Sequence, residues 1–130
     1  MALRVLLADD QLATRHIVRF NLEQFGFEVL DATDGQEAWK ILNEQQVHLL
    51  VTDDNMPRLS GIQLCEKLRQ VPALACLPVV MITAVAPAPN RATLERLGIE
   101  HCFMKPFSPR ELLDKICEIL WTKAGQTASA

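Results

Sequence analysis

The stretch LLVTD, residues Leu49 to Asp53, decides the fold. Its first four residues are apolar or β-branched without polar alternation, and such a run is typical of a strand covered by helices on both faces. Strands of this kind occur in parallel sheets, whose ligands bind beyond the carboxyl ends of the strands. The stretch therefore predicts a central strand of an α/β domain, with Asp53 at a candidate site.

Three other apolar runs also end in a reactive side chain. RVLLA (4–8) leads into Asp9 and Asp10, VVMI (79–82) into Thr83, and CFM (102–104) into Lys105. Because the carboxyl ends of parallel strands share one edge of the sheet, we expect these groups to lie close together. The sequence thus predicts three carboxylates, a hydroxyl and an ammonium at one site.

Segments with helical spacing of apolar residues separate the strands. This alternation is typical of right-handed βαβ units and predicts an α/β domain with a parallel sheet. Gly26 ends the first helix, Asp34-Gly35 indicates a turn, and Ser108 caps the last helix, where Glu111 completes a capping box. We expect strands at 4–8, 27–32, 49–52, 79–83 and 100–104, and helices at 11–25, 36–43, 61–69, 89–97 and from 109 onward.

Helical spacing also predicts which side chains face the core. Trp39 is interpreted as a core residue rather than as a ligand platform. The inward residues expected in the first and last helices are Thr14, Ile17, Val18, Leu22, Phe25, Leu112, Leu113, Ile116, Cys117 and Leu120.

The composition of the 130 residues limits the class of function. With 49% hydrophobic residues, the chain fits one domain at residues 1–121, followed by a polar segment at 122–130 that we interpret as a flexible tail or the start of a linker. A net charge of -3 argues against direct nucleic-acid binding. No run approaches the ~20 apolar residues of a membrane span, and the first residues lack a secretory pattern, so we expect a cytoplasmic protein without a membrane contact.

The cysteines and histidines indicate no metal or redox site. Their spacing lacks the close pairs of zinc and redox motifs, so we interpret the thiols as reduced. These residues are Cys65, Cys76, Cys102, Cys117, His16, His48 and His101.

The three carboxylates favour a divalent cation. Adjacent Asp9 and Asp10 are compatible with a solvated acidic turn, but Asp53 supplies a third carboxylate, and Mg²⁺ prefers oxygen ligands. Thr83 and Lys105 are compatible with an ordinary strand residue and a surface ammonium. Together, opposite three acids and Mg²⁺, they suit a phosphoryl group attached to a carboxylate oxygen.

These residues resemble the receiver domain of two-component response regulators. The likeness covers residues 3–120 and rests on the Asp9-Asp10 pair, on DDNMP (53–57) followed by Gly61, on Thr83-Ala84, and on Lys105-Pro106-Phe107. It implies a flavodoxin-like, doubly wound (βα)5 fold with strand order 2-1-3-4-5, and a regulatory domain that at most catalyses its own phosphorylation and dephosphorylation.

The resemblance also implies the role of each acidic residue. Asp53 would accept the phosphoryl group, and Mg²⁺ would bind Asp10 directly, Asp9 partly through water, Asp53, and the backbone carbonyl of Asn55. Asp54 is a rival acceptor by residue type. Neighbouring side chains of a strand point in opposite directions, and Asp53 has the register to Met56-Pro57, so Asp53 is preferred.

By the same likeness, Thr83 would move to hydrogen-bond the phosphoryl oxygen, and Lys105 would pair with it and precede a cis peptide bond at Pro106. The implied partners are a histidine kinase or phosphotransfer protein, and an output protein or fused effector domain that reads the face of the fourth helix, fifth strand and fifth helix. The oligomeric state stays open, with a monomer as one option.

Two features depart from the family pattern. Cys102 stands three residues before the lysine, where the family usually carries the aromatic residue of the switch, and Phe103 should point to the opposite face. The segment VAPAP (85–89) contains two prolines in the loop before the fourth helix, which narrows its conformations.

Two other classes of function remain as alternatives. A Mg²⁺-dependent phosphohydrolase could use the same aspartyl-phosphate chemistry, although such enzymes generally carry a D-x-D in the first strand and a cap domain. A purely structural flavodoxin-like interaction domain could share the fold, but the complete set of acids, threonine and lysine argues against it.

Overall fold

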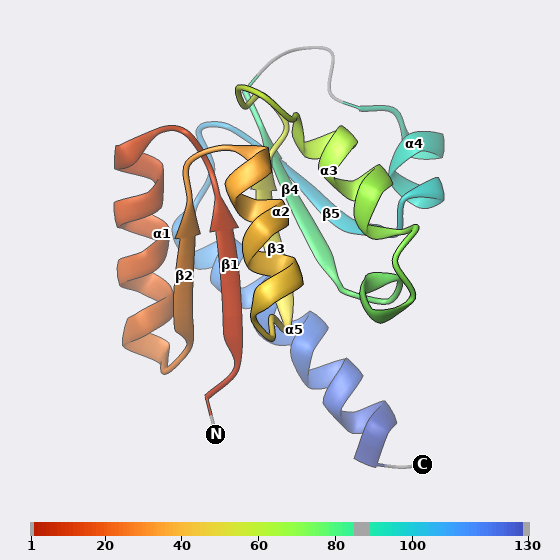
Figure 1. Ribbon diagram of the computed structural model, residues 1–130. Coiled ribbons are helices and arrows are strands. Elements are labelled where there is room, and N and C mark those ends of the chain that lie inside the picture. Colours follow the sequence, from red (N-terminus) through yellow and green to blue (C-terminus); the bar gives the residue numbers. More distant parts are fainter. Residues whose placement is uncertain (1, 85–88, 129–130) are drawn as a thin grey trace.

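The computed structural model describes residues 2–84 and 89–128, with side chains described as far as Thr122. A parallel sheet of five strands runs through the molecule in the order β2-β1-β3-β4-β5 (Figure 1), as the resemblance implied. The strands are β1 (Arg4–Ala8), β2 (Glu28–Ala32), β3 (Leu49–Asp53), β4 (Val79–Thr83) and β5 (Ile99–Met104).

Helices cover both faces of this sheet. Figure 1 shows α1 and α5 on one side and α2, α3 and α4 on the other, and the two hydrophobic clusters of the core match these layers. The helices are α1 (Leu12–Phe25), α2 (Gly35–Glu44), α3 (Gly61–Leu68), α4 (Arg91–Arg96) and α5 (Pro109–Ala128), with a short 3-10 helix at Pro72–Leu74.

The double cover explains the continuous apolar runs. Along β1, Val5 and Leu7 pack in the cluster with α1 and α5, whereas Leu6 packs in the cluster with α2 and α3. Every residue of β3 is buried. Burying a Leu or Val side chain contributes about 1.5–3 kcal/mol, so the three apolar residues of this strand, Leu49, Leu50 and Val51, stabilise the centre of the sheet.

Side chains cap the starts of four helices, α2 to α5, and the cap of α2 is described below. Ser60 and Gln63 form a capping box at α3, and the Asn90 side chain accepts from Thr93 N at α4. At α5, the Ser108 hydroxyl accepts from Glu111 N over 3.2 Å, as the sequence predicted. These caps satisfy backbone amides that lack helical partners. They also determine the residue at which each loop ends and the helix begins.

Two expectations about the first half of the chain are wrong. Ile17 and Phe25 were expected to face the core, but they are 48% and 53% exposed, because the buried stripe of α1 is narrow and consists of Val18 and Leu22. Asp34 does not begin a turn. It caps α2 by accepting from Glu37 N over 2.8 Å, since the residues that favour turns also favour helix starts.

The end of the chain is more helical than expected. α5 continues to Ala128, into the segment that we interpreted as a tail, and projects past the sheet in Figure 1. The interpretation of 122–130 as a tail or linker stays a prediction. Within the described ranges, no helix combines the length and apolar character needed to cross a membrane. Most of the VAPAP segment, residues 85–88, lies outside the described residues.

Candidate phosphoacceptor site

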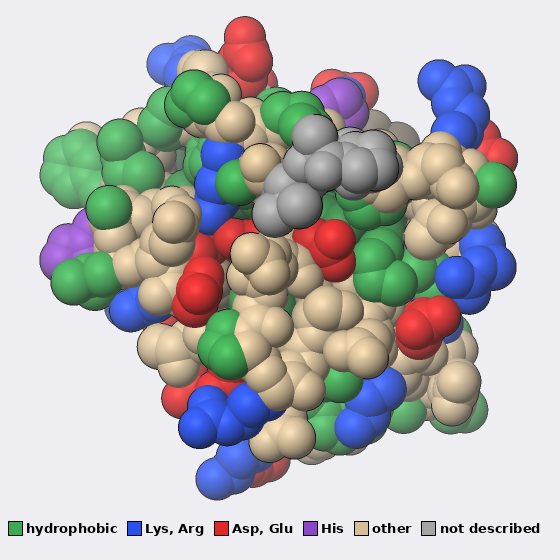
Figure 2. Space-filling model, turned by 90° about the horizontal axis from the view of Figure 1, so that it is seen from above, with side chains coloured by type: hydrophobic (Ala, Val, Ile, Leu, Met, Phe, Trp, Pro, Cys, Tyr) green, Lys and Arg blue, Asp and Glu red, His purple; other side chains and the backbone are tan. Residues whose placement is uncertain are grey.

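Three carboxylates meet at the carboxyl ends of β1 and β3. Oxygen atoms of Asp9, Asp10 and Asp53 all lie within 4.8 Å of one another. Asp9 is fully buried and Asp53 is 3% exposed, whereas Asp10 is open to solvent. Figure 2 looks down on this end of the sheet and shows acidic side chains gathered near the middle of the face. The predicted cluster of acids is therefore present.

Sheet register brings the acids together. β1 pairs with β3 in parallel, with Ala8 opposite Thr52, so the next residues, Asp9 and Asp53, leave neighbouring strands at the same level. The backbone N–H of Asp9 donates to the carbonyl of Ala32 over 3.1 Å, which ties the end of β1 to that of β2. Asp9 and Asp53 are 44 positions apart in the sequence, with two βα units between them. The pairing of β1 with β3 nevertheless places them side by side.

Lys105 joins the cluster from β5. Its Nζ lies 2.7 Å from Oδ2 of Asp53 and 3.0 Å from Oδ2 of Asp9. Its backbone N–H donates to the carbonyl of Thr83 over 2.8 Å, which holds the start of the β5–α5 loop against the end of β4. The peptide bond between Lys105 and Pro106 is cis, the form that the resemblance implied. One cation thus faces two buried carboxylates.

The surroundings alter the protonation of this group. Burial raises the pKa of Asp9 above its ordinary value, and the Gln11 N–H and Lys105 only partly oppose this. Burial lowers the pKa of Lys105, but the hydrogen bond to Asp53 and the negative charges of Asp9 and Asp53 outweigh it, so the net pKa is raised and the ammonium persists. The site therefore holds more negative charge than one lysine balances.

The donor set fits a divalent cation. Oδ2 of Asp9 is buried, and among the described residues no hydrogen-bond donor is well aligned with it, although Lys105 Nζ is close enough for an ion pair. A buried carboxylate oxygen with an open side is a suitable ligand for Mg²⁺, which takes carboxylate oxygens and retains waters. Exposed Asp10 leaves room for those waters.

Asp54 faces away from the cluster. Its Oδ1 accepts from Ile62 N over 3.2 Å, at the start of α3, whereas Oδ1 of Asp53 accepts from Asn55 N over 2.9 Å. Gly61 packs against this strand end so closely that a Cβ there would lie 2.5 Å from the Asp53 carbonyl oxygen. The side chains of Asp53 and Asp54 therefore point in different directions and have different hydrogen-bond partners, as strand alternation predicted.

Thr83 and Cys102 lie on the last two strands. Thr83 is buried at the end of β4, opposite Met104 of β5. Cys102 is half-buried and packs in the cluster with α2, α3 and α4, whereas Phe103 packs in the opposite cluster. The expected orientation of Phe103 is confirmed. All four cysteines are free thiols.

Sequence reasoning missed two residues near the site. The Gln11 side chain accepts from Lys105 Nζ over 2.8 Å, and Arg58 donates to Oδ2 of Asp34 over 2.7 Å. Arg58 has a positive φ of 68°, a conformation that sequence rules associate with Gly or Asn. For Gln11, one signal was present: it begins α1 although glutamine is not a preferred N-cap residue.

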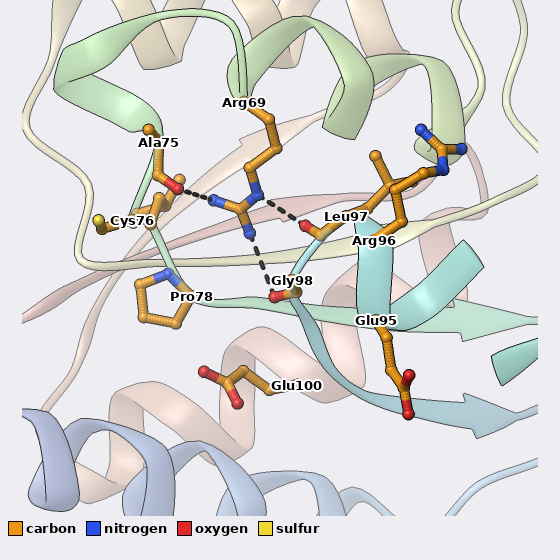
Figure 3. A pocket seen from close by; sticks show the side chains of 10 residues that line it. Arg69, Ala75, Cys76, Pro78, Glu95, Arg96, Leu97, Gly98 and Glu100 are labelled. Atoms are coloured by element: carbon orange, nitrogen blue, oxygen red, sulfur yellow. Dashed lines mark hydrogen bonds between the residues drawn. The ribbon is translucent and has the colours of Figure 1, made fainter. Parts of the chain in front are cut away.

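Among the cavities formed by the described residues, two lie at opposite ends of the sheet. One of about 530 Å³ adjoins the cluster and is lined by Gln11, Ile17, Ala84, Lys105 and Phe107, among others. The other, of about 400 Å³, lies at the amino ends of β4 and β5, far from the carboxylates (Figure 3). Figure 3 shows the Arg69 guanidinium pointing into it and bonded to the backbone carbonyls around it.

The parallel five-stranded sheet and the cluster of acids and lysine at its carboxyl end are the fold and site expected of a receiver domain. The model of the response regulator receiver domain matches residues 5–117. The chain therefore belongs to the response regulator receiver domain family.

Individual relatives agree with this assignment. A chemotaxis protein CheY homolog of Campylobacter jejuni is 32% identical and aligned over 98% of this chain and 99% of its own length. The crystal structure of a CheY-like receiver domain protein from Methanospirillum hungatei is similar with a TM-score of 0.88 and 28% identity, covering 97% of this chain and 99% of that one.

Other relatives are longer. The probable transcriptional regulator ycf27 of Cyanophora paradoxa is 35% identical over 97% of this chain, and the alignment covers 52% of that protein. The chain thus spans about half the length of such relatives. These relatives are response regulators, so the comparisons do not favour the phosphohydrolase alternative.

Proposed function

We propose that Asp53 accepts a phosphoryl group from a histidine kinase or histidine phosphotransfer protein. The observation that carries this proposal is the contact of Lys105 Nζ with Oδ2 of Asp53 inside a cluster of three carboxylates. A lone surface acid needs no buried cation beside it. An acid that gains a phosphoryl group needs a nearby positive charge and hydrogen-bond donors, and both groups are at hand.

The transfer forms one bond and breaks one bond. A carboxylate oxygen of Asp53 attacks the phosphorus atom, an O–P bond forms, and the bond from phosphorus to the donor's imidazole nitrogen breaks, with its electron pair returning to that nitrogen. Asp9, Asp10, Asp53 and the carbonyl of Asn55 would hold Mg²⁺. Bound there, Mg²⁺ would neutralise charge on the phosphoryl oxygens.

Lys105 and Thr83 would then stabilise the product. Lys105 already pairs with Oδ2 of Asp53, so a short movement of its ammonium reaches a phosphoryl oxygen. Thr83 lies at the end of the neighbouring strand β4, and its hydroxyl can serve as a donor after a side-chain rotation. The phosphoryl group brings about -1.5 to -2 charge into this buried site, which supplies the driving force for rearrangement.

The signal would leave through α4, β5 and α5. Thr83 is next to β5 in the sheet, and Cys102 on that strand is smaller than the aromatic residue usual in the family. We infer that side-chain packing around Cys102 contributes less to the switch than rotation of the Thr83 side chain. In this proposal, an output protein or a fused effector domain binds this face, and the interaction takes place in the cytoplasm. Residues 1–121 form the receiver domain.

A labelling experiment tests the acceptor. The protein is incubated with acetyl phosphate and Mg²⁺, and its intact mass is measured. We expect a gain of one phosphoryl group in the wild type and in Asp54→Ala, and no gain in Asp53→Ala. A gain that persists in Asp53→Ala, or that vanishes in Asp54→Ala with the fold intact by circular dichroism, contradicts the assignment.

A further inference from the structure

Gln11 is the N-cap residue of α1, but its side chain does not cap the helix. The residue has extended φ and ψ angles of -89° and 118°, as an N-cap residue has, but its side chain makes no cap hydrogen bond. Instead, Oε1 accepts from Lys105 Nζ over 2.8 Å and, more weakly, from the Thr14 hydroxyl over 3.4 Å. The side chain crosses from the β1–α1 loop to the β5–α5 loop, so helix capping does not explain its orientation.

Gln11 also contacts the buried acid of the cluster. Its backbone N–H donates to Oδ1 of Asp9 over 2.8 Å, which leaves the other oxygen, Oδ2, facing Lys105. One residue thus orients both members of the Asp9–Lys105 pair. The backbone directs the carboxylate, and the side chain directs the ammonium.

The number of donors on the ammonium makes the side chain significant. A lysine ammonium has three N–H donors, and Nζ of Lys105 has three oxygen neighbours, on Asp53, Asp9 and Gln11. The first two are carboxylates that Mg²⁺ and the phosphoryl group would engage. Gln11 supplies the remaining neighbour, and its carboxamide is neutral, so it holds the ammonium without adding a fourth negative charge.

We propose that Gln11 is a positioning residue for phosphorylation. It holds the Lys105 ammonium beside Asp53 while the carboxylates of Asp9 and Asp53 engage Mg²⁺ and the phosphoryl group. This inference rests on the proposed function of Asp53. It predicts that the effect of Gln11 on phosphorylation passes through Lys105, because the contact with Lys105 Nζ is the shorter one, at 2.8 Å, whereas the contact with the Thr14 hydroxyl, at 3.4 Å, stays within the first turn of α1.

A double-mutant cycle tests this route. The rate of phosphorylation by acetyl phosphate is measured at saturating Mg²⁺ for the wild type, Gln11→Leu, Lys105→Met and the double variant. With Lys105 present, we expect Gln11→Leu to slow phosphorylation about three- to tenfold. This is the effect expected from losing one partly exposed hydrogen bond to a charged group. In the Lys105→Met background, Gln11→Leu should change the rate less than about twofold.

Two further variants separate positioning from general disturbance. Gln11→Glu keeps an oxygen acceptor at the same distance and should retain Lys105 ordering, whereas Gln24→Leu makes the same substitution at an exposed position near the other end of α1 and should leave the rate unchanged. In the unphosphorylated protein, ¹⁵N relaxation of the Lys105 ammonium should report greater mobility in Gln11→Leu than in Gln11→Glu.

The outcomes distinguish this inference from the proposed function. If the wild type takes up no phosphoryl group, the proposed function fails. If the wild type is phosphorylated and Gln11→Leu reacts at the same rate, or slows equally in both backgrounds, the role of Gln11 is wrong. Unchanged Lys105 mobility in Gln11→Leu would overturn it independently of any phosphorylation measurement.

Discussion

Nζ of Lys105, at the end of β5, donates to Oδ2 of Asp53, at the end of β3, over 2.7 Å. The side chains of both residues are largely buried, with 12% and 5% of their surfaces exposed. Strand β4 lies between β3 and β5, so the contact crosses over the carboxyl end of β4. The lysine therefore offsets carboxylate repulsion before any phosphoryl group or metal is bound.

Lys105→Met should destabilise the protein. Removing the ammonium leaves Asp9 and Asp53 facing each other without a cation, and an unpaired buried charge costs several kcal/mol, so we expect a loss of about 2–4 kcal/mol. Urea unfolding at pH 7 without Mg²⁺ measures this. Lys40→Met, at an exposed position on α2, is the matched control and should change stability by less than about 0.5 kcal/mol.

The raised pKa of Asp9 predicts a pH dependence of stability. Its carboxyl has a higher pKa in the folded state than the ordinary value of 3.8, so the stabilisation from the bound proton is fully present below pH 3.8 and is lost as the pH rises through the folded pKa. Urea unfolding at a series of pH values checks this. The difference in stability between wild type and Asp9→Asn should change across this window, and a constant difference would contradict the assignment.

Mg²⁺ should reverse this loss at neutral pH. A cation that binds only the folded state stabilises it by RT ln(1 + [L]/Kd), or about 1.4 kcal/mol for each tenfold excess over Kd. We expect Mg²⁺ to raise the thermal midpoint of the wild type more at pH 7 than at pH 3.5, because the raised pKa of Asp9 favours its protonated form at the lower pH. Removal of Mg²⁺ with a chelator should return the midpoint to its original value.

The Asp34–Arg58 pair links α2 to the loop that follows Asp53. Asp34 caps α2, and the hydrogen bond from Glu37 N, with help from Arg58, holds the pKa of its carboxyl below the ordinary value of 3.8. Asp34→Ala should cost about 1–2 kcal/mol through loss of the cap. Asp34→Asn keeps a capping oxygen and should cost less, which chemical unfolding of both variants measures.

The sign of the pH effect at Asp34 is opposite to that at Asp9. Because the folded pKa is depressed, the stabilisation is present above pH 3.8 and is lost as the pH falls through the folded value. The stability difference between wild type and Asp34→Asn should therefore shrink under acid conditions. A difference that grows below pH 3.8 would contradict the proposed ion pair.

Arg69 should stabilise the amino ends of β4 and β5. Its guanidinium donates to the carbonyls of Leu97, Gly98, Leu74 and Ala75 over 2.6–3.2 Å, around the cavity in Figure 3. Arg69→Met leaves these carbonyls without a shared donor and should cost about 2–3 kcal/mol. Thermal unfolding checks this, with Arg96→Met as control, since the exposed Arg96–Glu66 pair should contribute less than about 1 kcal/mol.

Local pattern was sufficient for most of the fold. The apolar run at Leu49–Asp53 could only be stable between two helical layers, and the predicted strands differ from the observed ones by a residue or less at their ends. Predictions about single helix faces were weaker. Helical spacing alone did not reveal that Ile17 borders an open cavity beside Lys105, or that Phe25 stacks on Phe27 while staying half exposed.

The sequence by itself determined the chemistry of this protein: three acids, a hydroxyl and a lysine at the ends of strands, in an order that indicates a receiver domain. Only the tertiary structure decided how their charges are balanced. The contacts of Lys105 with Asp53, Asp9 and Gln11 join residues that are up to 96 positions apart, 105 minus 9, and depend on strand register and loop conformation. Sequence pattern encodes local periodicity, whereas distances between loops follow from packing of the whole sheet.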